Sequence, residues 1–364
     1  MSEGKVGGSR PFVAPWWRAD QLARRRVFLE GRSKVRKATE AYFDGRDFLA
    51  VETPAVQWSP GMEPHLKAFA TELERPGETS ASMYLHTSPE FAMKKLLAGG
   101  LPRIYQLARV FRNGEGSATH HPEFTMLEWY RAGQGYHDLI EDCVGLLRSA
   151  AKAAGTDRLF WSGRESDPFG DWKVITVAEA FQRYADIDLI ATAPDPCLPD
   201  IDLLSRQARR IGIDPHEGDQ WDDVFFRIFL DRIEPNLGHP VPTVLTDYPI
   251  SMAALSRPKP AAPHLCERFE IYVSGLELAN AFGELTDAAE QRKRFEADQS
   301  LKHELYGHSY PIDRDFLAAL EPDLGGGLPD CAGIALGFDR LVMLATHATT
   351  IEDVLWAPVS PPWD

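Results

Sequence analysis

Short runs in which apolar and polar positions alternate occur along much of the chain, and this period of two predicts β-strands. One run covers Phe48–Thr53, where Pro54 ends it, and another covers Tyr84–Thr87 and leads into a helix that starts near Pro89. Further runs with this pattern are RIYQLARVF, FTMLEWY, TVLTDY, RFEIYVS and GLELANAF. Short loops join several neighbours, which favours an α+β fold with an antiparallel sheet flanked by helices over a series of βαβ units.

Helical and irregular segments suggest the domain boundaries. Residues 1–15 contain Gly and Pro without apolar periodicity, so we predict a flexible tail there. A helical pattern covers Asp20–Phe43 with a break near Gly31, and helical periodicity returns over about 155–235, interrupted by prolines. We therefore predict one domain over residues 16–350, a helical insertion over about 155–235, and a C-terminal tail over 351–364.

Composition and charge narrow the class of protein. The chain has 364 residues, 44% hydrophobic and 26% charged, which is typical of a globular protein with a sizeable core. Its formal net charge of -15 has the wrong sign for binding nucleic acid over a broad surface. The cysteines lie far apart without a CxxC pair, and no run approaches the ~18 apolar residues of a membrane helix. We therefore expect a cytoplasmic protein that is not in a membrane, without a zinc site or a disulfide framework.

One segment departs from the acidic balance of the chain. Between Arg18 and Lys37, basic residues greatly outnumber the acidic residues Asp20 and Glu30. Such a segment is usually the solvated face of a helix, and the alternative is a docking surface for an acidic partner. The sequence leaves both interpretations open.

The TSPE segment lies between a predicted strand and a predicted helix. Thr87 or Ser88 can cap the helix, Pro89 suits its first turn, and Thr87 with Glu90 has the spacing of a capping box. Alternatively, a Glu at such an edge can hold the ammonium group of a ligand. The segment alone does not decide between these roles.

The segment FRNGEGSATHHPEFTMLEWY is more informative, because it is predicted to form a strand, a polar loop and a second strand. Arg112 ends the first strand, where its planar guanidinium can bind a phosphate. The loop carries His120 and His121, which can close over such a ligand.

The second strand of this hairpin carries residues suited to a nucleotide and a polar substrate. Phe124 offers a flat apolar face for a base, and alternation places Glu128 and Tyr130 on the same side of the strand. Core packing of the aromatic residues and a surface position for Glu128 are the alternatives. The segment as a whole favours a hairpin that holds a nucleotide and a substrate side by side.

The segment RFEIYVSGLELANAFGELTDA predicts a second hairpin with a two-residue turn at 274–275. In that register Tyr272 opposes Glu277, and Glu270 opposes Ala279, so the two glutamates are diagonal neighbours on one face. Two neighbouring carboxylates repel unless a cation lies between them, and oxygen ligands beside a phosphate site suit Mg²⁺. We therefore predict Glu270 and Glu277 as magnesium ligands.

Two polar residues later in this hairpin do not fit a straight strand. Asn280 and Glu284 have the parity opposite to that of Glu277, so a regular strand would direct them to the other face. A bulge or bend would be needed to bring them to one site, and the sequence does not supply evidence for it.

The segment PDCAGIALGFDRLVML combines small residues with an arginine. Gly337 permits close approach of a ligand to the backbone, and Arg340 lies at the start of an apolar helix. Arg340 could stack on a base opposite Phe124 and neutralise phosphate charge. An ordinary turn with a salt-bridged arginine is the alternative.

Taken together, these segments resemble the signature motifs of class II aminoacyl-tRNA synthetases of the lysyl type. VETP resembles the first motif, FRN with HHPEFTMLEWY the second, and GIALGFDRLVML the third, while GLELANAFGELTDA is similar to the lysine-pocket segment. The resemblance spans most of the chain from about Arg32 to Leu344. It implies the class II catalytic fold and a homodimer, because the first motif builds a dimer interface in that family.

The chain resembles more closely the paralogs of lysyl-tRNA synthetase that lack the anticodon-binding domain. That domain takes on the order of 100 residues before the first motif, whereas only about 30 residues precede the matching region here. The paralogs use ATP to attach β-lysine to a lysine of elongation factor P, so the resemblance implies this acceptor protein and makes tRNA an unexpected partner. Ala335 agrees with it, since lysyl-tRNA synthetases usually have Gly in that context.

The resemblance assigns roles position by position. Arg112 and Arg340 become the catalytic residues, Arg112 at the α-phosphate of ATP, while Phe124 and Arg340 face the adenine. Glu270 and Glu277 would hold Mg²⁺. The other ATP-binding positions are Asn113, Gly114, Glu115, His120, His121, Glu277, Leu278 and Gly337. The positions for lysine or β-lysine are Ser88, Pro89, Glu90, Glu128, Tyr130, Asn280, Glu284 and Ala335.

One position departs from the motif. The family usually has RNE, whereas Gly114 follows Asn113 here and Glu115 comes one place later. Gly114 offers only backbone groups, so either Glu115 takes over the contact with the adenine amino group or that contact is lost.

Two other functions remain open at this point. One is a truncated lysyl-tRNA synthetase-like enzyme that charges tRNA or another acceptor with lysine. The other is an inactive paralog that serves as a binding module, against which the retained charges of Arg112, Glu270, Glu277, Glu284 and Arg340 argue. The sequence does not decide between α-lysine and β-lysine.

Overall fold

The computed structural model describes residues 15–193, 199–322 and 327–359, so the predicted tail over 1–15 lies outside the described residues except for Pro15. The helices are α1 (Ala19–Asp44), α2 (Glu90–Ala98), α3 (Tyr136–Ala154), α4 (Val177–Ala185), α5 (Ile201–Arg210), α6 (Trp221–Ile228), α7 (Ala288–Tyr306), α8 (Arg314–Leu320), α9 (Phe338–Thr346) and α10 (Ile351–Val354). Within these described ranges, no helix combines the length and the apolar character needed to cross a membrane.

An eight-stranded sheet forms the centre of the molecule, in the order β1-β5-β6-β15-β14-β13-β10-β9. Its strands are β1 (Leu49–Ala50), β5 (Arg103–Phe111), β6 (Glu123–Ala132), β9 (Lys173–Thr176), β10 (Thr243–Thr246), β13 (Arg268–Val273), β14 (Leu276–Gly283) and β15 (Cys331–Gly337). Smaller sheets contain β2 (Val56–Gln57), β3 (Phe69–Leu73), β4 (Ala81–Leu85), β7 (Leu159–Trp161), β8 (Arg164–Ser166), β11 (Pro258–Lys259) and β12 (Ala262–Cys266).

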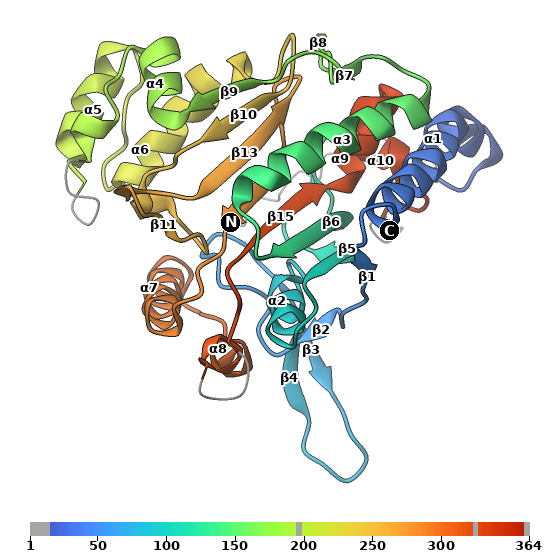
Figure 1. Ribbon diagram of the computed structural model, residues 1–364, viewed down its shortest axis with the longest axis horizontal. Coiled ribbons are helices and arrows are strands. Elements are labelled where there is room, and N and C mark those ends of the chain that lie inside the picture. The colour runs from blue at the N-terminus through green and yellow to red at the C-terminus, as the bar shows by residue number, and fades with distance from the viewer. Residues whose placement is uncertain (1–14, 194–198, 323–326, 360–364) are drawn as a thin grey trace, which may run out of the picture.

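The strands from β5 to β10 in this order pair antiparallel, as the short loops predicted. The two edges differ from that prediction, because β1 pairs parallel with β5 and β9 pairs parallel with β10. Parallel neighbours need a long connection. The hairpin β3–β4 and α2 connect β1 to β5, and the helices of the insertion connect β9 to β10. Figure 1 shows the hairpin as an arm that projects away from the sheet.

Alternation along β6 separates the two faces of the sheet. Leu127 and Trp129 belong to the largest hydrophobic core, which α1, α3, α9 and α10 complete on one face (Figure 1). Met126, Glu128 and Tyr130 project to the opposite face and line a cavity. The period of two therefore buries one set of side chains in the core and presents the other set to a site.

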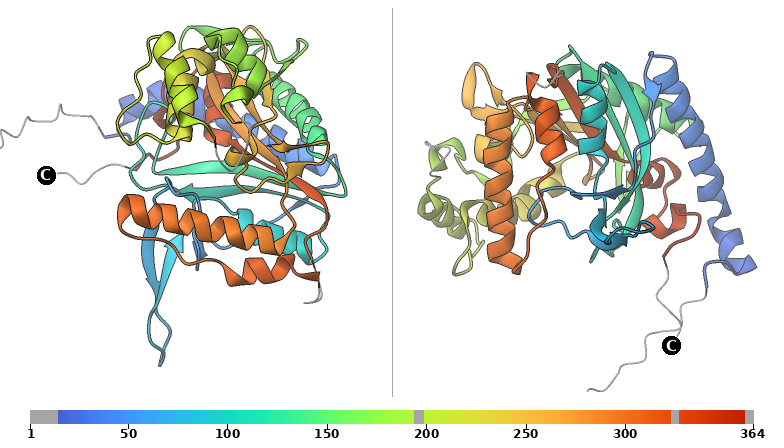
Figure 2. Two further views of the ribbon diagram at one scale, coloured as in Figure 1. Left: turned by 90° about the vertical axis from the view of Figure 1, so that its left-hand side faces the viewer. Right: turned by 90° about the horizontal axis from the view of Figure 1, so that it is seen from below.

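Two smaller hydrophobic clusters cover the ends of the cavity face. In one, Phe91 of α2 stacks on Phe316 of α8 with ring centroids 4.7 Å apart and also contacts Phe295 of α7. Figure 2 shows α7 and α8 side by side below the sheet. The other cluster joins α4 and α6 through Phe181 and Phe225, whose ring centroids lie 4.7 Å apart.

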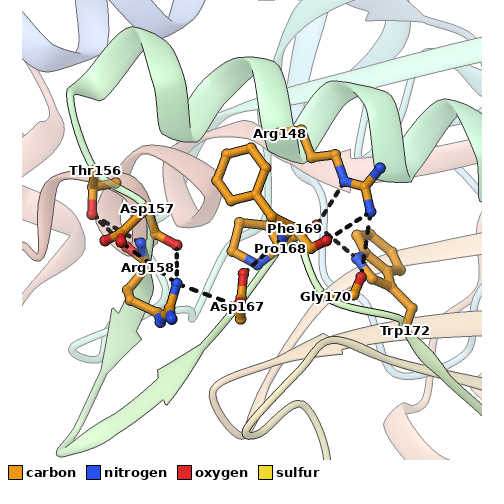
Figure 3. Close-up of polar contacts among 9 residues, drawn as sticks. All are labelled: Arg148, Thr156, Asp157, Arg158, Asp167, Pro168, Phe169, Gly170 and Trp172. Carbon is orange, nitrogen blue, oxygen red and sulfur yellow. Dashed lines mark hydrogen bonds and ion pairs between the residues drawn. The ribbon is translucent and has the colours of Figure 1, made fainter.

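The predicted insertion contains strands as well as helices. Its helices begin only at α4, and the preceding residues form β7, β8 and the edge strand β9. The loop before β9 is tied to α3, because Arg148 donates hydrogen bonds to the carbonyl oxygens of Pro168, Phe169 and Gly170 at 2.9, 3.2 and 3.3 Å (Figure 3). These hydrogen bonds hold the loop at residues 168–170, near the start of the insertion, against α3.

The segment predicted as a C-terminal tail is in part a structural element. Residues 351–354 form α10, and Ile351 and Val354 are buried in the largest core. The prediction was wrong for these residues because a four-residue helix is too short to show periodicity. Residues 360–364 lie outside the described residues.

The basic segment over 18–37 is not uniformly a solvated surface. It lies on α1, where Arg25 and Arg32 are buried and donate to Leu355 O and to Asp339, respectively. Arg24 and Arg26 are exposed, with side-chain exposed fractions of 64% and 77%. Any docking surface for an acidic partner is therefore limited to the exposed members.

Three of the four cysteines lie within the described ranges. Cys143, Cys266 and Cys331 are unbonded and buried. Cys197 lies outside the described residues.

The buried Asp142 on α3 provides a stability test. Its carboxylate accepts from Arg131 Nε at 2.7 Å and from Arg131 Nη2 at 2.6 Å, and Trp129 Nε1 donates to it at 3.1 Å. We expect Asp142→Asn to lower the free energy of unfolding by about 3–5 kcal/mol, because it leaves a buried guanidinium without its counter-charge. Urea unfolding followed by tryptophan fluorescence measures the change. The exposed neighbour serves as control, since Glu141→Gln should change stability by less than about 0.5 kcal/mol; equal midpoints for both variants would contradict the assignment.

Candidate active site

A cavity of about 390 Å³ opens on the face of the sheet that carries Glu128. It collects residues from β6, β14 and β15, from the loop between β5 and β6, and from α2, α7 and α9. The predicted site residues that line it are Ser88, Glu90, Arg112, Glu115, His120, His121, Phe124, Glu128, Tyr130, Glu277, Leu278, Asn280, Glu284, Ala335, Gly337 and Arg340. Segments that lie far apart in sequence thus form one site.

Strand pairing aligns residues of different segments in rows across the cavity face. In one row Glu270 of β13 pairs with Asn280 of β14, Asn280 with Ala335 of β15, and Ala335 with Glu128 of β6. The small side chain of Ala335 lies between two longer polar ones and leaves space above it. The register of the sheet therefore decides which polar groups are neighbours in the cavity.

A β-bulge at Leu278 supplies the irregularity that the sequence could not predict. The turn at 274–275 has positive φ at both residues, and Tyr272 opposes Glu277 as predicted. The next pair is Ile271 with Ala279, so Leu278 is an extra residue on β14. Glu270 consequently opposes Asn280, which corrects the predicted pairing with Ala279.

The bulge brings the two halves of β14 to the same face. After one extra residue, Asn280 regains the side of the sheet that Glu277 occupies, and both line the cavity. Glu284, which follows the end of β14, lines the cavity as well. The β-bulge therefore explains how Asn280 and Glu284 reach the same site as Glu277, although their spacing in the sequence predicts the opposite face.

Lys94 is a buried lysine that sequence reasoning missed, and it lies next to two glutamates of the cavity lining. Lys94 Nζ is 2.5 Å from Glu90 Oε1 and 2.6 Å from Glu284 Oε2. Burial opposes its charge, but Glu284 and Glu90 raise the pKa of Lys94 above its usual range. Lys94 follows Glu90 by four residues on α2, and this helical spacing was the signal available in the sequence.

Glu128 forms the centre of a hydrogen-bond network beside this ion pair. Ser88 Oγ donates to Glu128 Oε1 at 2.6 Å, and Tyr130 OH donates to Glu128 Oε2 at 3.0 Å. Burial, followed by the charge of Glu90, raises the pKa of Glu128 to about 8. Ser88 Oγ also accepts from Glu90 N at 3.0 Å, so it serves both the start of α2 and the site.

Gly333 keeps this end of the site tightly packed. A Cβ added at Gly333 would overlap the ring of Tyr130 and Oε1 of Glu284. Only glycine leaves both side chains in place, which gives the GIALG segment a packing role in addition to the predicted backbone access.

Arginines mark the other part of the cavity. The guanidinium of Arg112 lies 5.2 Å from the ring centre of Phe124, and its Nη1 is 3.7 Å from Glu115 Oε1. Within the described part of the chain, Arg112 Nε has no hydrogen-bond partner although it is buried. A buried donor of this kind can bind an anionic ligand group.

Arg340 is held by three contacts. It donates from Nη1 to Glu277 O at 2.8 Å, from Nε to Thr119 O at 3.3 Å, and from Nη2 to His120 Nε2 at 2.7 Å. Burial and the charges of Arg340 and Arg112 lower the pKa of His120 to about 4, so the neutral ring accepts this bond. In this arrangement it is Arg112, rather than Arg340, that faces Phe124.

The predicted metal ligands lie at the edge of the cavity. Glu270 does not line it, and it accepts from Arg268 Nη2 and Tyr272 OH at 2.6 Å each. Burial, followed by the charge of Glu270, raises the pKa of Glu277 to about 7. Glu234, from the insertion, is a third acidic residue whose charge acts on Glu277. These hard oxygen donors fit Mg²⁺, although the described residues contain no compact group of three or more such ligands.

Three further predicted residues lie outside the cavity lining. Pro89 is the residue before α2, and Asn113 N donates to Lys67 O at 2.6 Å. Gly114 has φ of 88°, a left-handed conformation that favours glycine, and the next residue, Glu115, lines the cavity instead.

Several lining residues were missed by sequence reasoning. They come from the loop between β2 and β3, from α7 and from the segment before β11, and they include Met62, Glu63, Leu66, Leu255 and Asp298. No local signal could have found them, because only the packing of α7 below the sheet brings these segments together.

Comparison with known proteins agrees with this architecture. A family model described as tRNA synthetases class II (D, K and N) matches residues 18–360. A protein of Vibrio cholerae named elongation factor P--(R)-beta-lysine ligase is 38% identical over 333 residues, covering 91% of this chain and 94% of that protein. Proteins with the same name from Haemophilus ducreyi and Proteus mirabilis are 38% and 36% identical, and these matches cover 89% and 95% of this chain and 91% and 98% of those proteins.

The raised pKa of Glu128 predicts how stability depends on pH without ligand. Between about pH 4.5 and 8 the folded state holds a proton on Glu128 more tightly than the unfolded state does. This contribution to stability is present at low pH and is lost as the pH rises through about 8. We expect the free energy of unfolding of the unchanged protein to fall between pH 6 and pH 8. The decrease over the same pH range should be about 1–3 kcal/mol smaller in Glu128→Gln, which has no carboxyl group to titrate at this position.

Urea unfolding at the two pH values provides the measurement. Glu123→Gln, on the same strand but outside the cavity lining, should keep the pH response of the unchanged protein. An identical pH response in Glu128→Gln would show that Glu128 does not carry the proton.

Proposed function

The chain belongs to the class II tRNA synthetase family (D, K and N), and from this premise we propose that it is an ATP-dependent ligase acting on elongation factor P. It activates β-lysine, or lysine, as an acyl-adenylate and transfers the acyl group to the ε-amine of a lysine on that acceptor protein. The printed name of the relatives and their match along about nine tenths of this chain support the proposal.

The observation that carries the proposal is the division of the cavity into a carboxylate-rich part and an arginine-containing part. Glu90, Glu128 and Glu284 suit the ammonium groups of a lysine, with Tyr130 beside them. Arg112 and Arg340 suit the phosphates of ATP, and Phe124 suits the adenine. A lysine bound in this way directs its carboxylate toward the α-phosphate.

In the first step, the lysine carboxylate attacks the α-phosphorus of ATP in line, and pyrophosphate leaves. Arg112 donates to the α-phosphate and, with Arg340, offsets the charge that builds on the phosphate oxygens. Glu115 would accept from the adenine amino group, and its place in the cavity lining, from which Gly114 is absent, supports this assignment. The contribution of the protein is positioning and electrostatic stabilisation, so no protein nucleophile is needed.

Glu270 and Glu277 would hold Mg²⁺, with Glu234 nearby. When bound, the ion would neutralise phosphate charge during adenylate formation. Arg268 holds the Glu270 carboxylate in its present orientation at 2.6 Å.

In the second step, the ε-amine of the acceptor lysine attacks the acyl carbon of the adenylate and forms an amide, and AMP leaves with the bonding electrons. The acceptor ammonium gives up one proton to solvent before the neutral amine attacks, and the nitrogen gives up a second proton to solvent or to the leaving AMP phosphate as the amide forms. The exposed arginines Arg24 and Arg26 of α1 could bind an acidic partner, which would compete with their ion pairs to Asp353 and Glu30.

We also propose that the protein is a homodimer in the cytoplasm. The resemblance of VETP to the first motif supports this, and large apolar side chains are exposed near that segment. Leu49, Val56 and Trp58 have exposed fractions of 52%, 41% and 52%. Burial against a second copy would remove this surface from water.

Intact mass spectrometry tests the overall reaction. Elongation factor P incubated with this protein, ATP, Mg²⁺ and β-lysine should gain the mass of one lysyl unit, and a parallel tube with α-lysine identifies the preferred substrate. Omission of ATP is the control and should abolish the gain. Charging of tRNA with lysine, without any mass gain on elongation factor P, would instead support a synthetase-like function.

Arg112→Ala tests the first step. We expect adenylate formation, measured by ATP–pyrophosphate exchange, to fall by at least about a hundredfold, because the main phosphate donor is removed. Arg109→Ala is the matched control, since Arg109 lies on β5, three residues before Arg112, with a side chain 47% exposed and outside the cavity lining. Exchange near the unchanged rate in Arg112→Ala would refute its assignment to the α-phosphate.

A further inference from the structure

Glu63 lies in the cavity wall but has no part in the contacts described above. It comes from the loop between β2 and β3 and lines the cavity together with Met62 and Leu66. Its Oε2 is buried and has no hydrogen-bond partner within the described ranges. A buried carboxylate oxygen without a donor is costly in a folded protein, so its presence in a cavity indicates a ligand that supplies the donor.

The loop that carries Glu63 is held firmly in place. Lys302 of α7 is buried, and its Nζ donates to Pro64 O and to Leu66 O at 2.7 Å each. Tyr310 OH accepts from Ala68 N at 2.8 Å, and the Lys302 ammonium lies 4.5 Å from the centre of the Tyr310 ring. The chain immediately after Glu63 is therefore fixed by contacts with α7 and the segment that follows it.

Two lysines near this part of the cavity are paired with groups other than the Glu63 carboxylate. Lys94 is engaged by Glu90 and Glu284, and Lys302 is engaged by backbone carbonyls. Burial and then the charge of Glu90 raise the pKa of Glu63, while Arg112 and Lys302 act in the opposite direction. Asp298 of α7 adds a further carboxylate to the wall, and burial followed by the charge of Glu63 raises its pKa to about 6.

Glu63 is also placed between the two parts of the cavity. Glu63 lines the same cavity as Glu90 of α2 and Arg112, the proposed phosphate-binding arginine. Glu284, Tyr130 and Gly333 mark the remote end of the amino-acid site. A lysine-like substrate with its carboxylate toward Arg112 would bring its nearer amino group to Glu63 and its terminal ammonium to Glu284.

We propose that Glu63 is a substrate-binding residue that, with Glu90, holds the ammonium group nearer to the substrate carboxylate and so makes the site selective for diamino acids. The inference rests on the proposed function, whose assigned residues do not include Glu63. Lys302 then acts as a positioning residue, because it holds the carbonyl groups of Pro64 and Leu66, directly after Glu63.

The experiment compares a diamino acid with an analogue that lacks the nearer amino group. In Glu63→Gln, we expect the Kd of β-lysine, measured by calorimetry without ATP, to rise about 10- to 100-fold, because a charge-assisted contact is lost. The Kd of 6-aminohexanoate, which keeps only the terminal ammonium, should change less than about twofold. In ATP–pyrophosphate exchange, the KM for β-lysine should rise while the KM for ATP stays unchanged.

Matched variants separate binding from folding effects. Glu63→Asp should retain part of the affinity for β-lysine, and Lys302→Met should reproduce the selective loss of Glu63→Gln. Glu78→Gln, an exposed carboxylate on the β3–β4 arm, should bind both ligands as the unchanged protein does. Thermal unfolding of each variant verifies that it is folded.

Two outcomes would overturn the inference. An unchanged Kd for β-lysine in Glu63→Gln would show that the carboxylate does not contact the substrate. An equal loss of affinity for β-lysine and for 6-aminohexanoate would show a general change of the cavity instead. Failure of the proposed function is distinguishable, because the unchanged protein would then bind neither β-lysine nor lysine and would not support pyrophosphate exchange.

Discussion

The register of the central sheet is the constraint on which the rest of the site depends. Pairing of β6, β15, β14 and β13 places Glu128, Ala335, Asn280 and Glu270 in one row, although these residues are spread over more than half of the chain. A shift of one residue on any strand would direct its polar side chains into the hydrophobic core on the other face. The bulge at Leu278 belongs to the same constraint, because it allows one strand to present Glu277 and Asn280 together.

Charge balance is the second organising feature. The amino-acid end of the cavity gathers several carboxylates in a buried place, and one lysine, Lys94, offsets the charges of Glu90 and Glu284. Burial, followed by the charge of Glu90, raises the pKa of Glu128 and of Glu63, because a buried carboxylate loses its hydration and lies near another one. A diammonium substrate would bring positive charge to these buried carboxylates, so the electrostatics of this end of the cavity favour the proposed ligand.

The arginine end has the opposite character. Arg340 is fixed by carbonyl groups and by a neutral His120, whereas Arg112 keeps a buried donor without a partner in the described part of the chain. One arginine is thus anchored in advance, and the other retains hydrogen-bonding capacity for a ligand. A preorganised donor set of this kind suits a phosphate group whose charge increases during a reaction.

Local patterns in the sequence were sufficient for the elements and for most of the site. Alternation in FTMLEWY predicted that Phe124, Glu128 and Tyr130 share a face, and the Ser-Gly turn predicted the register next to Tyr272; both are confirmed. Helix α10 is too short to show periodicity, and the parallel edges and the bulge were not predictable, because each depends on contacts between distant segments. Glu63 was missed for the same reason, whereas the spacing of Lys94 from Glu90 on one helix was visible in the sequence and only its pairing with Glu284 was not. A sequence reports the chemistry and periodicity of neighbouring residues, whereas only the tertiary structure decides which buried charge faces which, because that depends on strand register and on the packing of α2 and α7 against the sheet.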